Sequence, residues 1–131
     1  MKPDFSGEWV LNRQASTLSA AAAGIDSGVL RIDHRDPLCG FRMNMSASGQ
    51  AIEHAWEISS DGKEVAGGGF VARLSWDADT LVFQTCEQSP DAPWSMFWRY
   101  ELLEESRCLR AVEQIRGAGR DQDNIWMFDR R

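Results

Sequence analysis

Eight successive segments between Gly28 and Phe128 alternate large apolar residues with polar ones, and turn-forming residues separate them. Alternation with a period of two is typical of β-strands that bury one face and expose the other. The turns preserve this pattern, because each connection suits a loop with an even number of residues. A slip of one residue would move every side chain to the opposite face. The pattern therefore predicts an up-and-down antiparallel sheet with one continuous apolar face.

Turn lengths also predict which residues lie opposite each other on neighbouring strands. Ser48-Gly49 and Asp61-Gly62 suit two-residue hairpin turns, and a longer loop suits the segment after Arg116. The predicted pairs are Met43–His54, Ile58–Val65, Leu74–Phe83, Trp98–Glu113 and Glu113–Trp126. The opposite face of the same strands carries most of the charged residues, which is typical of a solvated surface.

An apolar face that spans a sheet of about ten strands cannot remain in water, so the sheet must close or fold on itself. We predict an all-β fold, an up-and-down antiparallel β-barrel of about 8–10 strands, formed by residues 1–131 as a single domain. The first strand is expected from Ser6 to Asn12. Residues 13–24 are rich in Ala and Ser and end in Gly24, which predicts one short helix after the first strand.

Composition and charge exclude several classes of partner. The chain has 131 residues, a net charge of −6 and no basic stripe, which disfavours nucleic acid and anionic membrane surfaces. No apolar run approaches the roughly 20 residues that span a bilayer, so membrane insertion is not expected. The start carries no apolar signal segment, which predicts a cytoplasmic protein, or a secreted or periplasmic one if a signal peptide was removed. Nothing in the pattern indicates an oligomeric state.

The cysteines do not indicate a metal centre or a disulfide framework. Cys39, Cys86 and Cys108 are odd in number and far apart, which favours reduced thiols. The sequence contains no Gly-x-Ser-x-Gly motif, no P-loop and no Cys/His metal spacing. We therefore expect no metal and no cofactor, and a haem bound by His54 has no supporting motif.

Two ionisable residues fall on the predicted inner face. His54 alternates with Ile52 and Trp56, and four roles stay open for it: a core histidine, a hydrogen-bonding contact to a ligand, a general base or a metal ligand. Glu113 alternates with apolar residues, so either a register slip places it outside or it serves a polar purpose inside, where burial would raise its pKa. If the two face each other across the interior, they form a candidate acid–base pair.

Aromatic residues surround these two positions on the predicted inner face. Trp56, Trp98 and Trp126 would wall a cavity, and Tyr100 adds a hydroxyl group. A flat, partly aromatic molecule with one or two polar groups would suit such a lining. The predicted ligand-binding residues are Met43, His54, Trp56, Trp98, Tyr100, Glu113 and Trp126.

The start of the chain resembles a known signature. Gly7-Glu8-Trp9 is similar to the Gly-x-Trp motif of lipocalins, in which the Trp closes one barrel end, often against an Arg from late in the chain. The candidates for that Arg here are Arg116, Arg130 and Arg131. A longer pattern also resembles bacterial lipocalin-like proteins of unassigned role. Its segments are Asp4-Phe5-Ser6-Gly7-x-Trp9, Ile32-Asp33-His34-Arg35-Asp36-Pro37 and Ser60-Asp61-Gly62-Lys63-Glu64.

The resemblance implies a small β-barrel of the calycin superfamily. Length and strand number are more similar to fatty-acid-binding proteins than to long lipocalins. Two departures from that family stand out: residues 13–24 are short for a two-helix portal, and no Arg-x-Tyr carboxylate clamp lies near the C-terminus.

Three functions follow from this pattern. We expect binding of a small hydrophobic or aromatic ligand in the barrel cavity. The alternative is a small-molecule enzyme of the isomerase, lyase or hydrolase type, with His54 and Glu113 as its catalytic acid–base pair. A third interpretation is an interaction module whose barrel is filled by side chains.

Overall fold

The structure is a computed structural model that describes residues 2–87, 91 and 93–131. Ten strands form one antiparallel sheet in the order β4-β3-β2-β1-β10-β9-β8-β7-β6-β5. The strands are β1 (Gly7–Leu11), β2 (Ile25–Arg35), β3 (Leu38–Ala47), β4 (Gln50–Ser59), β5 (Val65–Gly67), β6 (Phe70–Asp77), β7 (Thr80–Glu87), β8 (Trp94–Leu103), β9 (Cys108–Gly117) and β10 (Gln122–Arg130). The all-β, antiparallel prediction is confirmed.

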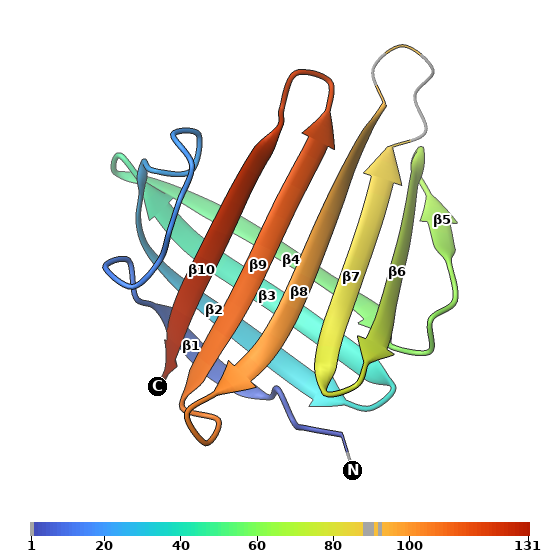
Figure 1. Ribbon diagram of the computed structural model, residues 1–131, viewed down its shortest axis with the longest axis horizontal. Helices are drawn as coiled ribbons and strands as arrows, with labels where there is room; N and C mark the ends of the chain where they lie inside the picture. The colour runs from blue at the N-terminus through green and yellow to red at the C-terminus, as the bar shows by residue number, and fades with distance from the viewer. Residues whose placement is uncertain (1, 88–90, 92) are drawn as a thin grey trace.

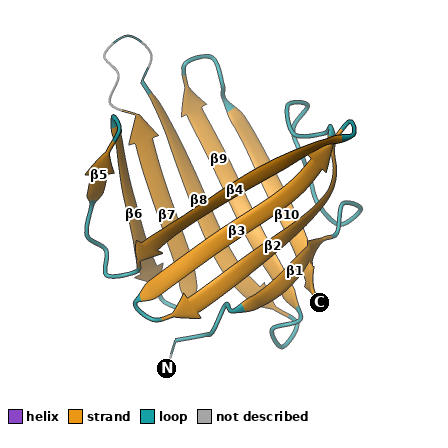
Figure 2. Cartoon of the chain, turned by 180° about the vertical axis from the view of Figure 1, so that it is seen from behind, coloured by secondary structure: helices purple, strands orange, loops and turns teal. Residues whose placement is uncertain are grey.

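The sheet curls into a half-barrel with two facing layers. Strands β6 to β10 form the layer in front in Figure 1, and β2 to β4 cross behind them at a steep angle. Figure 2 shows the same crossing from behind. Strands β4 and β5 stand at the two ends of the strand order, and no ladder joins them among the described residues. The apolar faces of the strands turn inward, and backbone hydrogen bonds do not close the sheet beside β4, which contacts β6 without pairing with it in the described chain.

Most of the predicted strand pairing is confirmed. Met43 lies opposite His54, Leu74 opposite Phe83, and Trp98 opposite Glu113. Two predicted pairings are wrong. Asp61-Gly62 does not close a hairpin, because the chain crosses there from β4 to the other layer, where β5 pairs with β6.

The second wrong pairing concerns the β9–β10 hairpin. Glu113 pairs with Asn124, and Trp126 pairs with Ala111, so the register differs by two residues from the predicted one. The loop contains two left-handed glycines, Gly117 and Gly119, and its length could not be read from composition. Because side chains alternate with period two, a shift of two residues leaves each of them on its predicted face.

The predicted helix after the first strand is not formed. Residues 13–24 are turns, and the only regular element in them is a bridge between Thr17 and Ile125. The backbone N–H of Thr17 donates to the Ile125 carbonyl at 2.8 Å, and the Ile125 N–H donates back at 2.8 Å. The Asn12 side-chain oxygen accepts from the Ala15 N–H at 3.1 Å. The segment therefore satisfies its backbone against β10, and tertiary pairing overrides the helix propensity of its alanines.

Trp9 closes one end of the barrel, as the signature implies. Its side chain is fully buried, and its indole N–H donates to the Phe5 carbonyl at 3.0 Å. Of the three candidate arginines, Arg130 covers the Trp9 ring, with the guanidinium carbon 4.2 Å from the ring centroid. Arg130 also donates to the Ser6 carbonyl at 2.9 Å. Gly7 has φ at 137°, a conformation that favours glycine, and a side chain there would also begin 2.6 Å from the Arg130 guanidinium.

The remaining motif segments meet at this same end. Asp36 Oδ1 accepts hydrogen bonds from Ser60 Oγ at 2.7 Å and from Trp76 Nε1 at 3.1 Å, and His34 Nε2 lies 3.4 Å from it. The hydroxyl of Ser60, together with Trp76, holds the pKa of the Asp36 carboxyl below its usual range. His34 Nδ1 accepts from the Phe5 N–H at 3.3 Å. The motif residues therefore tie the chain start, the β2–β3 turn and the end of β4 into one closed end.

Candidate functional site

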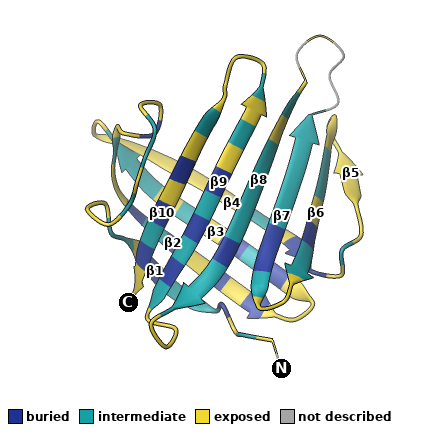
Figure 3. Ribbon diagram, viewed as in Figure 1, coloured by how far each residue is buried: buried dark blue, intermediate teal, exposed yellow. Residues whose placement is uncertain are grey.

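The inner face changes from buried to exposed along each strand. On β4 the exposed fraction rises from 8% at Ile58 to 47% at Ile52, and on β6 from none at Leu74 to 43% at Phe70. Figure 3 shows the same change, with buried residues toward the end where both chain termini lie. We call the accessible part the open half of the inner face: Met43, Ile52, His54, Trp56, Phe70, Ala72, Phe83, Thr85, Met96 and Trp98. Large apolar side chains there meet solvent although they point inward.

Aromatic rings form a continuous series from the rim of this half into the core. His54 packs against Trp56 with ring centroids 5.1 Å apart, and Trp56 stacks on Phe41 at 4.8 Å. Phe41 contacts Tyr100 at 5.5 Å, and Tyr100 stacks on Trp98 at 5.7 Å. The series crosses from β3 and β4 to β8. It therefore gives both layers of the half-barrel a flat, polarisable lining that suits an aromatic or apolar guest.

Glu113 is the buried charged group of the interior. It is 6% exposed, so the inner placement is confirmed and the register-slip alternative is wrong. Its Oε1 accepts from Trp126 Nε1 at 3.0 Å and from Asn124 Nδ2 at 2.9 Å. Asn124 is oriented in turn by the Ser19 N–H, which donates to its Oδ1 at 2.7 Å, and by Gln122. No described residue donates to Glu113 Oε2.

Sequence reasoning missed Ser19 and Gln122, which orient Asn124 and so act on this carboxyl group only through it. Ser19 was assigned to the predicted helix, and only the pairing of its segment with β10 brings it to Asn124. Gln122 alternates with Asn124 on the inner face, so the period of β10 was the signal that could have identified it.

Burial raises the pKa of Glu113, and the hydrogen bonds from Trp126 and Asn124 oppose that rise. The folded state thus holds this proton more tightly than the unfolded chain does. Its stabilising contribution is fully present below the unfolded-state pKa and is lost as pH rises through the folded-state pKa. Tyr100, fully buried beside Glu113, has its pKa raised by the same loss of hydration.

We expect Glu113→Gln to become more stable relative to wild type as pH rises. Glutamine keeps an oxygen for the Trp126 and Asn124 hydrogen bonds but carries no buried charge. Between pH 5 and pH 8 the difference in unfolding free energy should shift in favour of the variant by about 1–2 kcal/mol. Urea unfolding at both pH values measures it, with Glu53→Gln on the exposed face of β4 as the control. A difference that does not change with pH would contradict the assignment.

His54 and Glu113 are not in contact. His54 is solvent-exposed on β4, and no hydrogen bond or ion pair joins it to Glu113 in the described chain. Met43 lies opposite His54 and is partly buried against the core. The structure thus brings Trp98, Trp126 and Tyr100 near Glu113, and places Met43 and Trp56 with His54. The proposed catalytic pair stays a hypothesis in which the two groups would act from separate walls.

Trp56 and Trp98 differ in how their indole N–H groups are satisfied. Trp98 Nε1 lies 2.8 Å from the sulfur of Met96. Trp56 Nε1 is buried without any hydrogen-bond acceptor. A buried donor without a partner costs free energy, which an acceptor on a bound molecule would recover.

Cysteine chemistry is disfavoured at the two thiols with altered acidity. Burial raises the pKa of Cys39 to about 12, and the hydrogen bond to Glu104 raises that of Cys108 to about 11. Neither thiol therefore forms the nucleophilic thiolate near neutral pH. All three cysteines are free. The described residues contain no group of three or more His, Cys, Asp and Glu side chains that could hold a metal ion. No helix of sufficient length and apolar character to cross a membrane occurs among them either.

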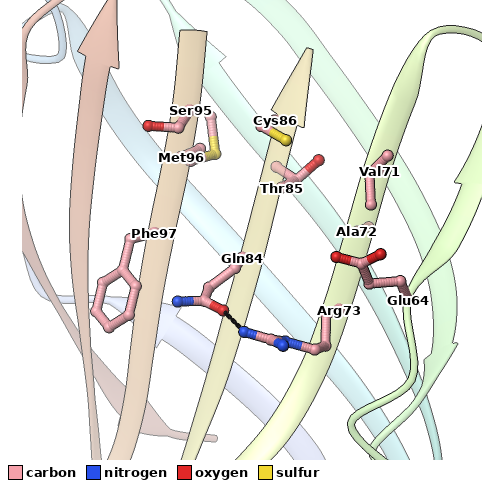
Figure 4. A pocket seen from close by; sticks show the side chains of 10 residues that line it. All are labelled: Glu64, Val71, Ala72, Arg73, Gln84, Thr85, Cys86, Ser95, Met96 and Phe97. Carbon is pink, nitrogen blue, oxygen red and sulfur yellow. Dashed lines mark hydrogen bonds between the residues drawn. The ribbon is translucent and has the colours of Figure 1, made fainter. Parts of the chain in front are cut away.

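Two pockets lie mainly on the outer face. One has a volume of 260 Å³ and is bordered by Arg73 and Gln84, which hydrogen-bond at 2.5 Å (Figure 4). The other has a volume of 490 Å³ and lies over β2, β3 and β4, where Arg31, Arg42, Asp33 and Glu57 mix both signs of charge. Both are shallow hollows over exposed strand surfaces. The first is also lined by Phe97 and by Ala72, Thr85 and Met96 of the open half, and the second by Phe41 and Trp56.

The architecture is shared with several solved structures. No protein-family model matches the chain, and neither does any curated protein. The fluorescent protein UnaG aligns with a TM-score of 0.70 at 11% identity, over 97% of each chain. The fatty acid transporter REP1-NXSQ aligns at 0.62 and 11% identity, over 98% of this chain and 96% of that one. Lipid binding protein 8 of Caenorhabditis elegans aligns at 0.63 and 14% identity, over 97% and 95%. The chain therefore shares the β-barrel fold of these proteins.

Proposed function

We propose that this protein binds a small hydrophobic or aromatic molecule against the open half of the inner face. The observation that carries the proposal is the exposure of inward-facing side chains. Ile52 and Phe70 point to the interior of a curled sheet and yet are 47% and 43% exposed. A filled barrel would have buried them, as it does Leu74 and Leu81 at the closed end. A small molecule would remove this apolar surface from water at a gain of about 25 cal/mol per Å².

The structural neighbours support the same class of ligand. REP1-NXSQ is a fatty acid transporter and the nematode neighbour is a lipid binding protein, and both share the barrel over nearly its full length. At 11% and 14% identity they support the architecture of the site and leave the ligand to be argued from this chain's own residues.

A tryptophan scan at two alanines tests where binding occurs. Ala72 lies on the inner face of β6 and packs against the core, whereas Ala55 lies on the exposed face of β4 and borders the larger outer pocket. Ala72→Trp should fill the space and weaken binding of the neutral apolar dye Nile red at least tenfold. Ala55→Trp should leave it unchanged. Fluorescence titration of both variants measures the two affinities.

The same titration can also contradict the proposed binding site. Loss of Nile red binding in Ala55→Trp with retention in Ala72→Trp would place the dye in the outer pocket and overturn the proposal. Failure of the wild-type protein to bind the dye would favour a filled barrel.

A further inference from the structure

We propose that the molecule bound against the open half donates a hydrogen bond to Glu113 Oε2, so that the site selects an alcohol, amide or amine over a carboxylate. This inference rests on the proposed function and specifies the chemical class of its ligand. It separates the site from one that holds a fatty acid by its carboxylate group.

The first support is the asymmetric hydrogen bonding of Glu113. Its Oε1 already accepts from Trp126 Nε1 and Asn124 Nδ2, at 3.0 and 2.9 Å. Those two donors and the Ser19–Asn124 bond fix the orientation of the carboxyl group. Oε2 has no donor among the described residues, although the side chain is 94% removed from solvent. Oε2 is not among the buried polar atoms that lack a partner, so it keeps access to water, and a ligand that displaces this water has to supply a donor in its place.

The second support is the absence of a basic side chain beside this carboxyl group. In the described strands, the arginines that flank the open half alternate onto the outer face. They are Arg31, Arg42, Arg73, Arg99, Arg110 and Arg116. Arg130 lies at the closed end over Trp9. A bound carboxylate would therefore face the Glu113 carboxylate with no fixed positive charge to offset the repulsion. This repulsion would weaken the binding of carboxylate ligands relative to alcohols, amides and amines.

The third support is a pair of unmatched polar groups within the ring series, on Trp56 and on Tyr100. Trp56 Nε1 is buried and lacks an acceptor. The Tyr100 hydroxyl forms no hydrogen bond with another described residue, and the Tyr100 ring stacks on Trp98, which lies opposite Glu113 on the neighbouring strand. An aromatic ligand with a donor at one edge and an acceptor at the other would satisfy Glu113 and Trp56 while it packs on these rings.

The test compares three probes that share one ring system: 1-naphthylmethanol, 1-naphthylmethylamine and 1-naphthoate. Isothermal titration calorimetry at pH 8 measures the three affinities. The wild-type protein should bind the alcohol and the amine at least tenfold more tightly than the carboxylate. Glu113→Gln should shift that ratio toward the carboxylate by tenfold or more. In this variant the glutamine oxygen keeps the hydrogen bonds from Trp126 and Asn124. The glutamine NH₂ group therefore points toward the ligand and acts as a donor.

Glu53→Gln, on the exposed face of β4, removes the same charge at a distance and should leave the ratio unchanged. Equal wild-type affinity for the three probes, or a preference for naphthoate, would overturn this inference while Nile red binding upheld the proposed function. Absence of both naphthyl and Nile red binding would overturn the two together. The wild-type ratio needs no substitution, so it decides the matter even if Glu113→Gln fails to fold.

Discussion

Trp9→Ala is expected to lower the free energy of unfolding by about 3–5 kcal/mol, the range for deleting a large buried aromatic side chain. Trp9 is fully buried at the closed end and packs among the core residues there. Its loss leaves a cavity between the layers and removes the surface on which the Arg130 guanidinium rests. The Phe5 carbonyl also loses its indole donor. Urea unfolding followed by far-UV circular dichroism measures the change.

Trp9→Phe is the matched control for this substitution. It retains an aromatic ring under Arg130 and removes the indole N–H and part of the volume. It should cost about 1–2 kcal/mol. If Trp9→Ala cost no more than Trp9→Phe, the closed end would not depend on the volume of this side chain, and its role as the plug of the barrel would be wrong.

Gly117→Ala should destabilise the protein by about 2–4 kcal/mol, from backbone strain combined with overpacking. Gly117 ends β9 with φ at 98°, a conformation that favours glycine. A Cβ there would overlap the carbonyl oxygen of Pro93 and lie 3.0 Å from the Trp94 Cα. Both neighbours are backbone atoms, so neither can rotate away. Thermal unfolding monitored by circular dichroism reports the loss.

Gly119→Ala separates the two contributions to that loss. Gly119 lies in the same loop with φ at 71°, and nothing lies within 4 Å of the position its Cβ would take. This variant should be destabilised by the backbone strain alone, by about 1 kcal/mol. Equal destabilisation by the two variants would show that the contact with Pro93 carries no cost and that the β8–β9 pairing can relax around it.

The alternation of residues was sufficient to predict which side chains face inward. Leu74, Leu81 and Tyr100 were assigned to the inner face and are buried there. This assignment is correct even for the β9–β10 hairpin, whose register was wrong, because a shift of two residues leaves each side chain on the same face of the sheet. For the same reason Glu113 was found inside, although only one of its two predicted partners, Trp98, was right and the other, Trp126, was wrong.

Local propensity failed where long-range pairing was stronger. The alanine-rich composition of residues 13–24 predicts a helix, but Thr17 instead forms two backbone hydrogen bonds with Ile125. That pairing joins positions far apart in the chain, and no pattern within the segment signals it. The choice of Arg130 over Arg116 and Arg131 as the cover of Trp9 likewise depends on how β1 and β10 align: Trp9 lies directly opposite Arg130 in that ladder.

The sequence by itself predicted about 8–10 strands, the inward face and, through a resemblance, the closing role of Trp9, because alternation, turn residues and a short motif are local properties of the chain. Only the tertiary structure decided how deep each inward residue lies. His54 and Glu113 both alternate inward, yet one is exposed on β4 and the other is buried against β10. The physical reason is that burial depends on how far the curled sheet brings its two layers together, and a period of two carries no information about that distance.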